Sequence, residues 1–185
     1  IKRGGRMFVN RTQSELLKNA SIEDFDISNG SLKKDGKLGF TFTAAYGNSG
    51  WALKPIQLSD DVISIKSYVS TNFNGQNANA FLAVGDGTDK DQVLKIGIYY
   101  GKNTICIEYA TNVQGHSVRA TVDRGEQTPI EITIDQKKRL LFIDVNGDAF
   151  SCKFPQSFKR ITHAGYANVG SNQECSPLEI KKIIK

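Results

Sequence analysis

Apolar and polar residues alternate along much of the second half of this 185-residue chain. From Pro129 to Gly147 the sequence reads P-I-E-I-T-I-D-Q-K-K-R-L-L-F-I-D-V-N-G, so apolar residues recur at every second position on both sides of a charged turn. This period is typical of strands that bury one face. Asn146 and Gly147 tolerate the positive φ angles that a tight turn requires. The segment therefore predicts antiparallel hairpin structure.

Other short strands are predicted between Gly- and Asn-rich turns. Leu94, Ile96 and Ile98 share one face of such a strand, and Lys95 and Tyr99 lie on the opposite face. In all, the pattern indicates about a dozen short strands and no convincing long helix. This arrangement predicts an all-β sandwich or jelly roll of antiparallel sheets.

Length and composition fit one β-rich domain. A chain of 185 residues is large enough for a hydrophobic core, and its 39% of hydrophobic residues suits a β-rich globular domain. We expect residues 1–20 to be a basic lead-in or linker, with one helical turn over residues 12–17, and residues 21–185 to form a single jelly-roll domain. No apolar run is long enough to span a bilayer.

The charge is mildly basic and dispersed. The formal net charge is +5 and the pI is near 9.1, but Lys and Arg lie in several separate segments. A nucleic-acid-binding protein would more often concentrate such charge among aromatic residues, so no nucleic-acid partner is expected. One interpretation is that these lysines lie in solvated turns and on edge strands, where they discourage aggregation. The alternative is that they bind an acidic ligand such as a uronic-acid polysaccharide.

Three cysteines, Cys106, Cys152 and Cys175, lack the close spacing of zinc ligands. A Cys152–Cys175 disulfide between the last strands is one interpretation. Three reduced, mostly buried thiols are the other. The sequence leaves both open.

The order of the predicted pieces resembles the concanavalin A-like and laminin G-like jelly rolls. An apolar strand precedes a hairpin, a second hairpin ends in x-D-x-N/D-G, and an A/I-G strand precedes a last strand that alternates apolar with charged residues. In this chain the pieces are Ala80–Val84, Leu94–Tyr109, Ile130–Gly147, Ala164–Tyr166 and Leu178–Ile184. The resemblance covers residues 21–185 and implies a two-sheet sandwich. Its members include polysaccharide-degrading enzymes, carbohydrate-binding modules and adhesion domains, so the fold does not choose the function.

The catalytic motifs of related enzymes are not found. Hydrolases of this fold carry their carboxylates as E-x-D-x-x-E on one strand face, and the nearest acidic cluster, Glu23–Asp26, has the wrong spacing. Lyases of this fold carry R-x-E and Q-I-H elements; the segment Arg11–Glu15 resembles the first only loosely, and the second is missing. No catalytic residue is therefore predicted, and whether the chain is a module of a glycoside hydrolase stays open.

A loop rich in Gly and Asn carries the first candidate ligand-binding residues. The segment Y-G-N-S-G-W places Tyr46, Asn48 and the only tryptophan, Trp51, close together. Saccharide recognition combines a flat apolar platform with a few placed polar groups, and loops on a rigid scaffold commonly carry such sites. The alternative is that Trp51 caps the core.

A predicted strand face carries the other candidates. Lys95 and Tyr99 point away from the apolar face of their strand, and Glu108 on the next strand is expected beside them. We predict Lys95 and Tyr99 to be ligand-binding residues. Ordinary cross-strand pairing is the alternative.

A calcium site is a further expectation. Asp86, Asp89 and Asp91 lie in the loop G-D-G-T-D-K-D, and calcium prefers several oxygen ligands. Jelly rolls of the type that this chain resembles often hold a structural calcium near a sheet edge. The loop lacks a closing glutamate, and a solvated turn is the alternative.

These observations favour a non-catalytic carbohydrate-binding domain. The resemblance implies an accessory module of an extracytoplasmic polysaccharide-processing protein, with a poly- or oligosaccharide as the partner. A glycoside hydrolase or polysaccharide lyase with an unrecognised site is one alternative. A laminin G-like protein-interaction or adhesion domain is another. The sequence does not define the glycan or the oligomeric state.

Overall fold

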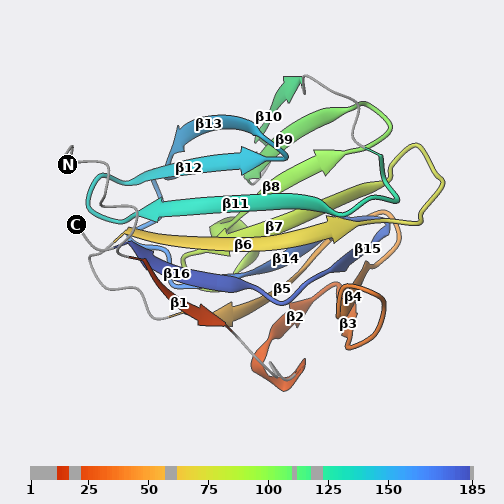
Figure 1. Cartoon of the computed structure of the whole chain (residues 1–185), viewed down its shortest axis with the longest axis horizontal. Coiled ribbons are helices and arrows are strands. Elements are labelled where there is room, and N and C mark those ends of the chain that lie inside the picture. Colours follow the sequence, from red (N-terminus) through yellow and green to blue (C-terminus); the bar gives the residue numbers. More distant parts are fainter. Residues whose placement is uncertain (1–11, 17–21, 57–61, 110–111, 118–122, 184–185) are drawn as a thin grey trace, which may run out of the picture.

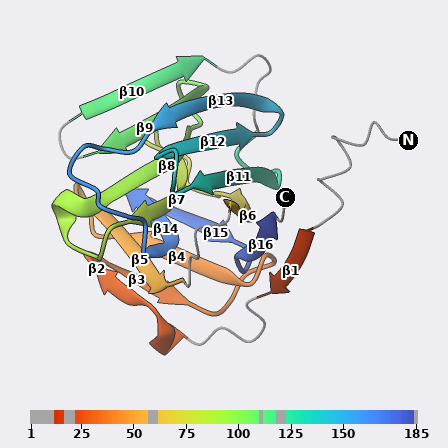
Figure 2. The ribbon, with the colours of Figure 1, turned by 90° about the vertical axis from the view of Figure 1, so that its left-hand side faces the viewer.

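Two antiparallel sheets face each other in the computed structural model (Figure 1), which describes residues 12–16, 22–56, 62–109, 112–117 and 123–183. Within these ranges, sheet A has nine strands and sheet B has seven. Every strand pairing is antiparallel. Figure 2 shows the two layers from the side, with the edge strands β10 and β13 at the same end of the sandwich.

Sheet A runs in the order β13-β12-β11-β6-β15-β4-β3, and β16 pairs with both β6 and β1. Its strands are β1 (Thr12–Leu16), β3 (Gly30–Lys33), β4 (Phe40–Ala44), β6 (Val62–Ser70), β11 (Thr128–Asp135), β12 (Leu140–Val145), β13 (Asp148–Lys153), β15 (Asn172–Cys175) and β16 (Glu179–Ile183).

Sheet B runs in the order β10-β9-β8-β7-β14-β5-β2. Its strands are β2 (Asp26–Ser28), β5 (Ser49–Pro55), β7 (Asn79–Gly85), β8 (Val93–Tyr99), β9 (Thr104–Tyr109), β10 (Asn112–Ser117) and β14 (His163–Val169). Two single-turn 3₁₀ helices, η2 (Ile22–Asp24) and η3 (Lys90–Gln92), lie outside the sheets.

The alternating segment of the second half forms the predicted hairpin structure. β11 pairs with β12, and Ile132 lies opposite Ile143 on the buried face. The next connection, from β12 to β13, turns at Asn146 and Gly147, whose φ angles are 52° and 94°. Asp144 Oδ1 accepts the Gly147 N–H at 2.8 Å and holds this turn. The strand periodicity and the turn prediction are both confirmed.

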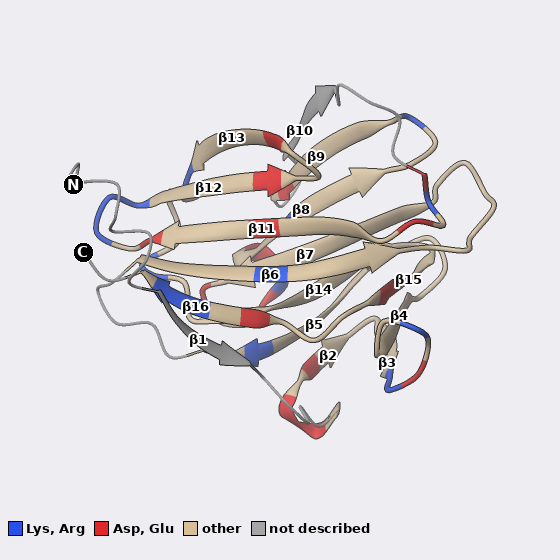
Figure 3. Ribbon diagram, in the orientation of Figure 1, with Lys and Arg blue, Asp and Glu red and all other residues tan. Residues whose placement is uncertain are grey.

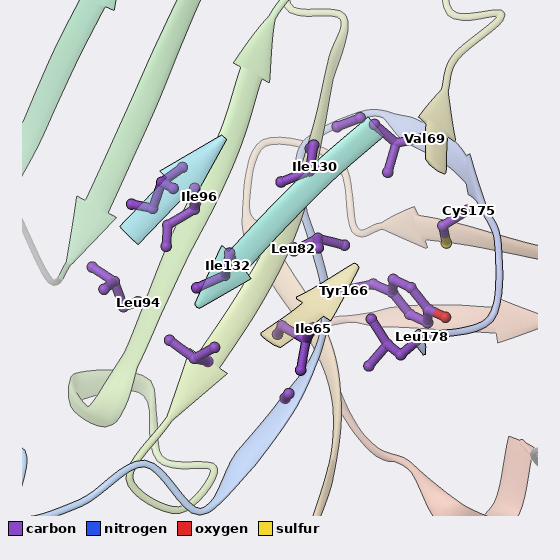
Figure 4. Packing of buried hydrophobic residues seen from close by; sticks show 14 of the residues in the cluster. Ile65, Val69, Leu82, Leu94, Ile96, Ile130, Ile132, Tyr166, Cys175 and Leu178 are labelled. Carbon is purple, nitrogen blue, oxygen red and sulfur yellow. The ribbon is translucent and has the colours of Figure 1, made fainter. Parts of the chain in front are cut away.

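The core lies between the two sheets because each contributes one apolar face (Figure 4). Ile65 and Ile132 of sheet A and Leu82 and Ile96 of sheet B have no exposed surface. Tyr166 of β14 is also fully buried, and its hydroxyl donates to the Ser176 carbonyl at 2.8 Å. Side chains at period two therefore fill the interior, as antiparallel sandwiches require.

One polar side chain of sheet A completes the backbone pairing of sheet B. The register between β7 and β14 ends where Phe81 faces Ala167. There the Gln173 amide of β15 accepts the Phe81 N–H and donates to the Phe81 carbonyl, both at 2.9 Å. Gln173 and Phe81 are fully buried, so this amide replaces a strand partner and joins the two layers.

Charged residues are interspersed over both sheets (Figure 3). On the outer face of sheet A, Lys66 of β6 lies between Glu131 of β11 and Glu179 of β16. Opposite charges on neighbouring strands stabilise a sheet modestly. The dispersed charge of the sequence is therefore also dispersed in space among the described residues.

Two expectations need correction or resolution. Thr12–Leu16 forms strand β1 and pairs with β16, so the helical turn expected over residues 12–17 is wrong; residues 1–11 and 17–21 lie outside the described residues.

Cys152 and Cys175 are free thiols, as is Cys106. β13 and β15 are four strand positions apart in sheet A, or about 19 Å at the usual strand spacing, which is too far for a disulfide.

Candidate functional site

The outer face of sheet B carries most of the predicted ligand-binding residues. Leu94, Ile96 and Ile98 of β8 belong to the main core, whereas Tyr99 packs against a separate apolar cluster on the other face. Lys95 shares that outer face, opposite Glu108 of β9 in the strand register. The expected division of the two faces is confirmed.

The separate apolar cluster makes this outer face a packed surface. It consists of Trp51, Leu53, Phe81, Ala83, Val93, Cys106 and Ala167. The Tyr99 ring meets the Phe81 ring edge to face with centroids 5.4 Å apart. The Trp51 indole N–H donates to the Thr88 carbonyl at 3.1 Å, so the loop after β7 is fastened over this face. Trp51 is only 6% exposed and packs in this outer-face cluster rather than in the main core between the sheets.

A cavity of about 340 Å³ opens beside Trp51. Four regions contribute to it: the turn after β2, the start of β5, the helix η3 and the strand β8. Its lining residues are Asn29, Asn48, Ser49, Trp51, Lys90, Asp91 and Lys95. Amide, hydroxyl, ammonium and carboxylate groups therefore surround one aromatic side chain, a composition suited to a small polar ligand. We call this the sheet B cavity.

A buried ion pair lies at the edge of the sheet B cavity. Lys95 and Glu108 are each only 8% exposed, and Lys95 Nζ lies 3.7 Å from Glu108 Oε1. The ammonium also donates to Ser49 Oγ at 3.0 Å, although β7 and β14 separate β8 from β5 in the sheet order. Burial lowers the pKa of Lys95, and the Glu108 carboxylate acts in the opposite direction. The sheet therefore fixes a desolvated ammonium at the cavity.

Tyr99 is held close to the same carboxylate. Burial raises the pKa of Tyr99 well above its ordinary value, and the negative charge of Glu108 adds to the shift. The Lys102 ammonium lies 5.9 Å from the centroid of the Tyr99 ring. Tyr99 thus stays a neutral phenol at physiological pH and packs beside the cavity rather than lining it.

The structure brings together three of the five predicted ligand-binding residues. Asn48, Trp51 and Lys95 all line the sheet B cavity. Tyr46 is 95% exposed and lies outside the lining, although the Asn48 amide donates to its carbonyl at 3.4 Å. Tyr99 contacts Phe81 instead. A ligand-binding role for all five residues stays a prediction.

The three predicted calcium ligands take different positions. Asp86 Oδ2 accepts the backbone N–H of Lys159 at 2.7 Å and that of Arg160 at 3.4 Å, so it fastens one loop to another. Asp89 precedes η3, and Asp91 lines the sheet B cavity. In the part of the chain that the structure describes, no three His, Cys, Asp or Glu side chains gather as a metal-binding group. Calcium binding stays a prediction.

Sequence reasoning missed three cavity residues. Asn29 lies in the turn between β2 and β3 with φ of 54°, and it lines the cavity from a segment distant in the sequence from β5. Ser49 directly follows the predicted Asn48, and alternation along β5 places it on the same face as Trp51. Lys90 lies in the aspartate-rich loop, whose carboxylates are the feature that indicates a ligand site.

A second depression, of about 440 Å³, lies on the outer face of sheet A. Phe142, at 46% exposure, lines it together with Glu131 and Asp144, which face each other across β11 and β12. Glu131 accepts a hydrogen bond from Ser64 Oγ at 2.5 Å. Both carboxylates are only half-buried. This depression contains none of the predicted ligand-binding residues, so the sheet B cavity is the stronger candidate.

No protein-family model and no curated protein matches this sequence. Solved structures do match its fold. The carbohydrate-binding module CBM66 from Bacillus subtilis gives a TM-score of 0.67 at 8% identity, over 84% of this chain and 94% of that chain. A protein of unknown function with a galectin-like fold, also from Bacillus subtilis, gives 0.64 at 8% identity, over 94% and 96% of the two chains.

A lectin from Bauhinia forficata, solved in complex with GalNAc, gives a TM-score of 0.55 at 12% identity, over 92% of this chain and 98% of that chain. Identities this low establish shared architecture only. The chain therefore has the concanavalin A-like jelly-roll fold, as its sequence pattern predicts. Across the described ranges, the helices are too short and too polar for any to cross a membrane.

Proposed function

We propose that this chain is a non-catalytic carbohydrate-binding module that holds a poly- or oligosaccharide in the sheet B cavity. The observation that carries the proposal is the composition of that cavity, in which Asn29, Asn48, Ser49 and Lys95 surround the edge of Trp51. Saccharide hydroxyls need both donors and acceptors, and this lining supplies both. The carbohydrate-binding module and lectins with the same fold support the proposal by analogy.

The proposal extends to the setting of the module. We assign it an accessory role in an extracytoplasmic polysaccharide-processing protein, because binding without chemistry is useful when a catalytic unit is held on the same polymer. The proposed calcium ligands are Asp86, Asp89 and Asp91, of which Asp89 and Asp91 are exposed in the loop beside the cavity. A bound calcium would fix the loop that carries Lys90 into the lining.

Glycan binding by the whole chain tests the proposal. The protein is screened against immobilised neutral and acidic glycans, with calcium and with chelator, and each hit is checked for product formation. Saccharide binding without cleavage supports the module. Cleavage would assign the chain to the enzymes, and binding of a protein partner without glycan competition would assign it to the adhesion domains.

Two exposed residues of the cavity rim give suitable variants. Asn48→Ala and Lys90→Ala remove polar groups without disturbing the core, and each is expected to weaken saccharide binding about fivefold, the value of one hydrogen bond. Phe142→Ala on the outer face of sheet A is the matched control and should leave affinity unchanged. Equal affinities in all three variants would remove the site from the sheet B cavity.

A further inference from the structure

The sheet B cavity contains a fixed, positively charged hydrogen-bond donor in addition to neutral polar groups. The Lys95 side chain is nine-tenths buried, and its ammonium group has three donors and no acceptor. Among the described residues, its oxygen partners are Ser49 Oγ at 3.0 Å and Glu108 Oε1 at 3.7 Å. The second distance is an ion pair rather than a short hydrogen bond, so donor capacity remains at the cavity.

Ser49 extends this donor set. Its hydroxyl oxygen accepts the Lys95 N–H, which leaves the hydroxyl proton to donate elsewhere. No acceptor for that proton is found among the described residues, and Ser49 lines the cavity. Glu108, Lys95 and Ser49 thus form a polarised chain that presents an O–H and an N–H to the cavity, and each bond of such a chain strengthens the next.

The charged residues of the cavity lining also favour an anionic ligand. Lys90 and Asp91 are exposed and both line the cavity, and Lys95 forms its ion pair with Glu108. Glu108 does not itself line the cavity. The lining residues therefore carry two ammonium groups and one carboxylate. The net charge of +5 would also draw a polyanion toward the molecule.

We infer that the ligand of the sheet B cavity is a saccharide whose ring bears a carboxylate, that is, a uronic-acid residue, held by Lys95 and Ser49. This inference rests on the proposed function and narrows it. The carboxylate accepts from the Lys95 N–H and the Ser49 O–H, Asp91 accepts from a ring hydroxyl, and Lys90 faces the next anionic unit along the polymer. A buried donor set left without its acceptor is costly, so the cavity discriminates against a neutral ring.

The test compares matched ligands on the whole chain. Oligosaccharides of galacturonic, glucuronic and mannuronic acid are measured by calorimetry against their methyl esters, which keep the ring and remove the charge. Sulfated and neutral oligosaccharides of equal length complete the set. At least one uronic-acid ligand is expected to bind about tenfold or more tightly than its ester, which matches the loss of a hydrogen bond to a charged group.

Two variants connect the discrimination to the proposed residues. Ser49→Ala removes one donor without changing charge. The double variant Lys95→Met/Glu108→Gln removes the ion pair as a unit and so avoids leaving one buried charge alone. Both should fold, as melting temperatures will check. The double variant should bring the affinity for acid and ester to within about threefold, and Ser49→Ala, which keeps the Lys95 ammonium, should reduce the discrimination without abolishing it. Lys37→Ala, a change in an exposed turn remote from the cavity, is the control.

The outcomes separate the inference from the proposed function. Equal binding of acid and ester, or tighter binding of neutral or sulfated glycans, would overturn the carboxylate assignment while leaving a carbohydrate-binding module. Acid binding that high salt abolishes and that neither variant changes would also overturn it, because a diffuse charge effect would then be the cause. Binding to no saccharide at all would overturn the proposed function itself.

Discussion

At the scale of residues, the unusual feature is the ion pair of Lys95 and Glu108, which is buried although it does not lie between the two sheets. Lys95 and Glu108 are each 8% exposed on the outer face of sheet B. Buried ion pairs seldom stabilise a fold more than apolar residues of the same size would. Stability alone therefore gives no reason for this pair, whereas a cavity that needs an oriented ammonium does.

Removing one member of the pair should destabilise the protein strongly. Glu108→Ala leaves the Lys95 ammonium buried without its counter-charge, and we expect the free energy of unfolding to fall by about 3–5 kcal/mol. Urea denaturation measures this loss. Glu126→Ala, in an exposed turn, is the control and should change stability by no more than about 0.5 kcal/mol. Equal, small effects would mean that solvent reaches the pair.

At the scale of elements, tight turns fix the register of the hairpins. Gly147 follows Asn146 in the connection from β12 to β13 with φ of 94°, and a Cβ at this position would contact no atom within 4 Å. Any cost of adding a side chain there is therefore conformational rather than steric. The same reasoning does not apply to Gly125, whose φ is not in the left-handed region and where a Cβ would make only an ordinary contact, with Asp123 Oδ1 at 3.6 Å.

This contrast gives a matched pair of variants. Gly147→Ala should lower the free energy of unfolding by about 1–2 kcal/mol, because a non-glycine residue is strained at this φ. Gly125→Ala should be neutral or slightly stabilising. Thermal unfolding of both variants measures the difference. Similar melting temperatures would show that the turn at Gly147 relaxes to another conformation at little cost.

Element-scale periodicity explains which parts of the fold were predictable from sequence. The alternation of Ile130, Ile132 and Ile134 depends only on neighbours two residues apart, and it correctly identified a buried strand face. Thr12–Leu16 has no such alternation, and its strand exists because β16 offers an edge, which a local pattern cannot reveal. Long-range pairing is the information that single segments lack.

The candidate site was predictable only where one segment carried it. Asn48 and Trp51 stand close together in the sequence, and Lys95 was found from its strand face. Asn29 and Lys90 join them because the turn after β2 and the helix η3 line the same cavity as the start of β5 and β8, and nothing in either segment signals this arrangement. Glu108 was expected beside Lys95, but its burial came from the packing of the whole face.

At the scale of the whole molecule, buried acids make stability dependent on alkaline pH. Burial raises the pKa of Cys152 to about 11 and that of Tyr100 to about 12, from ordinary values of 9.0 and 10.0. Burial also raises the pKa of Tyr99, Tyr166, Cys106 and Cys175. These groups bind protons more tightly when folded, so their stabilising contribution is complete below pH 9 and is lost as pH rises toward 12.

The urea midpoint should therefore fall steadily from pH 9 to pH 11. The lowered pKa of Lys95 opposes this trend below its ordinary value of 10.5, but six raised acids outweigh one base. Cys152→Ala should lose less stability over the same range, because it removes one of the acids. A midpoint that stays constant to pH 11 would contradict the prediction.

The Gln173 contact has a consequence for motion. The Phe81 amide hydrogen is bonded to a side chain of the opposite sheet, and both residues are sealed from water. Fraying of strands within sheet B is therefore insufficient to release this hydrogen to solvent, because the two layers must first come apart. The rate of deuterium uptake at the Phe81 amide should therefore report how often the two sheets separate.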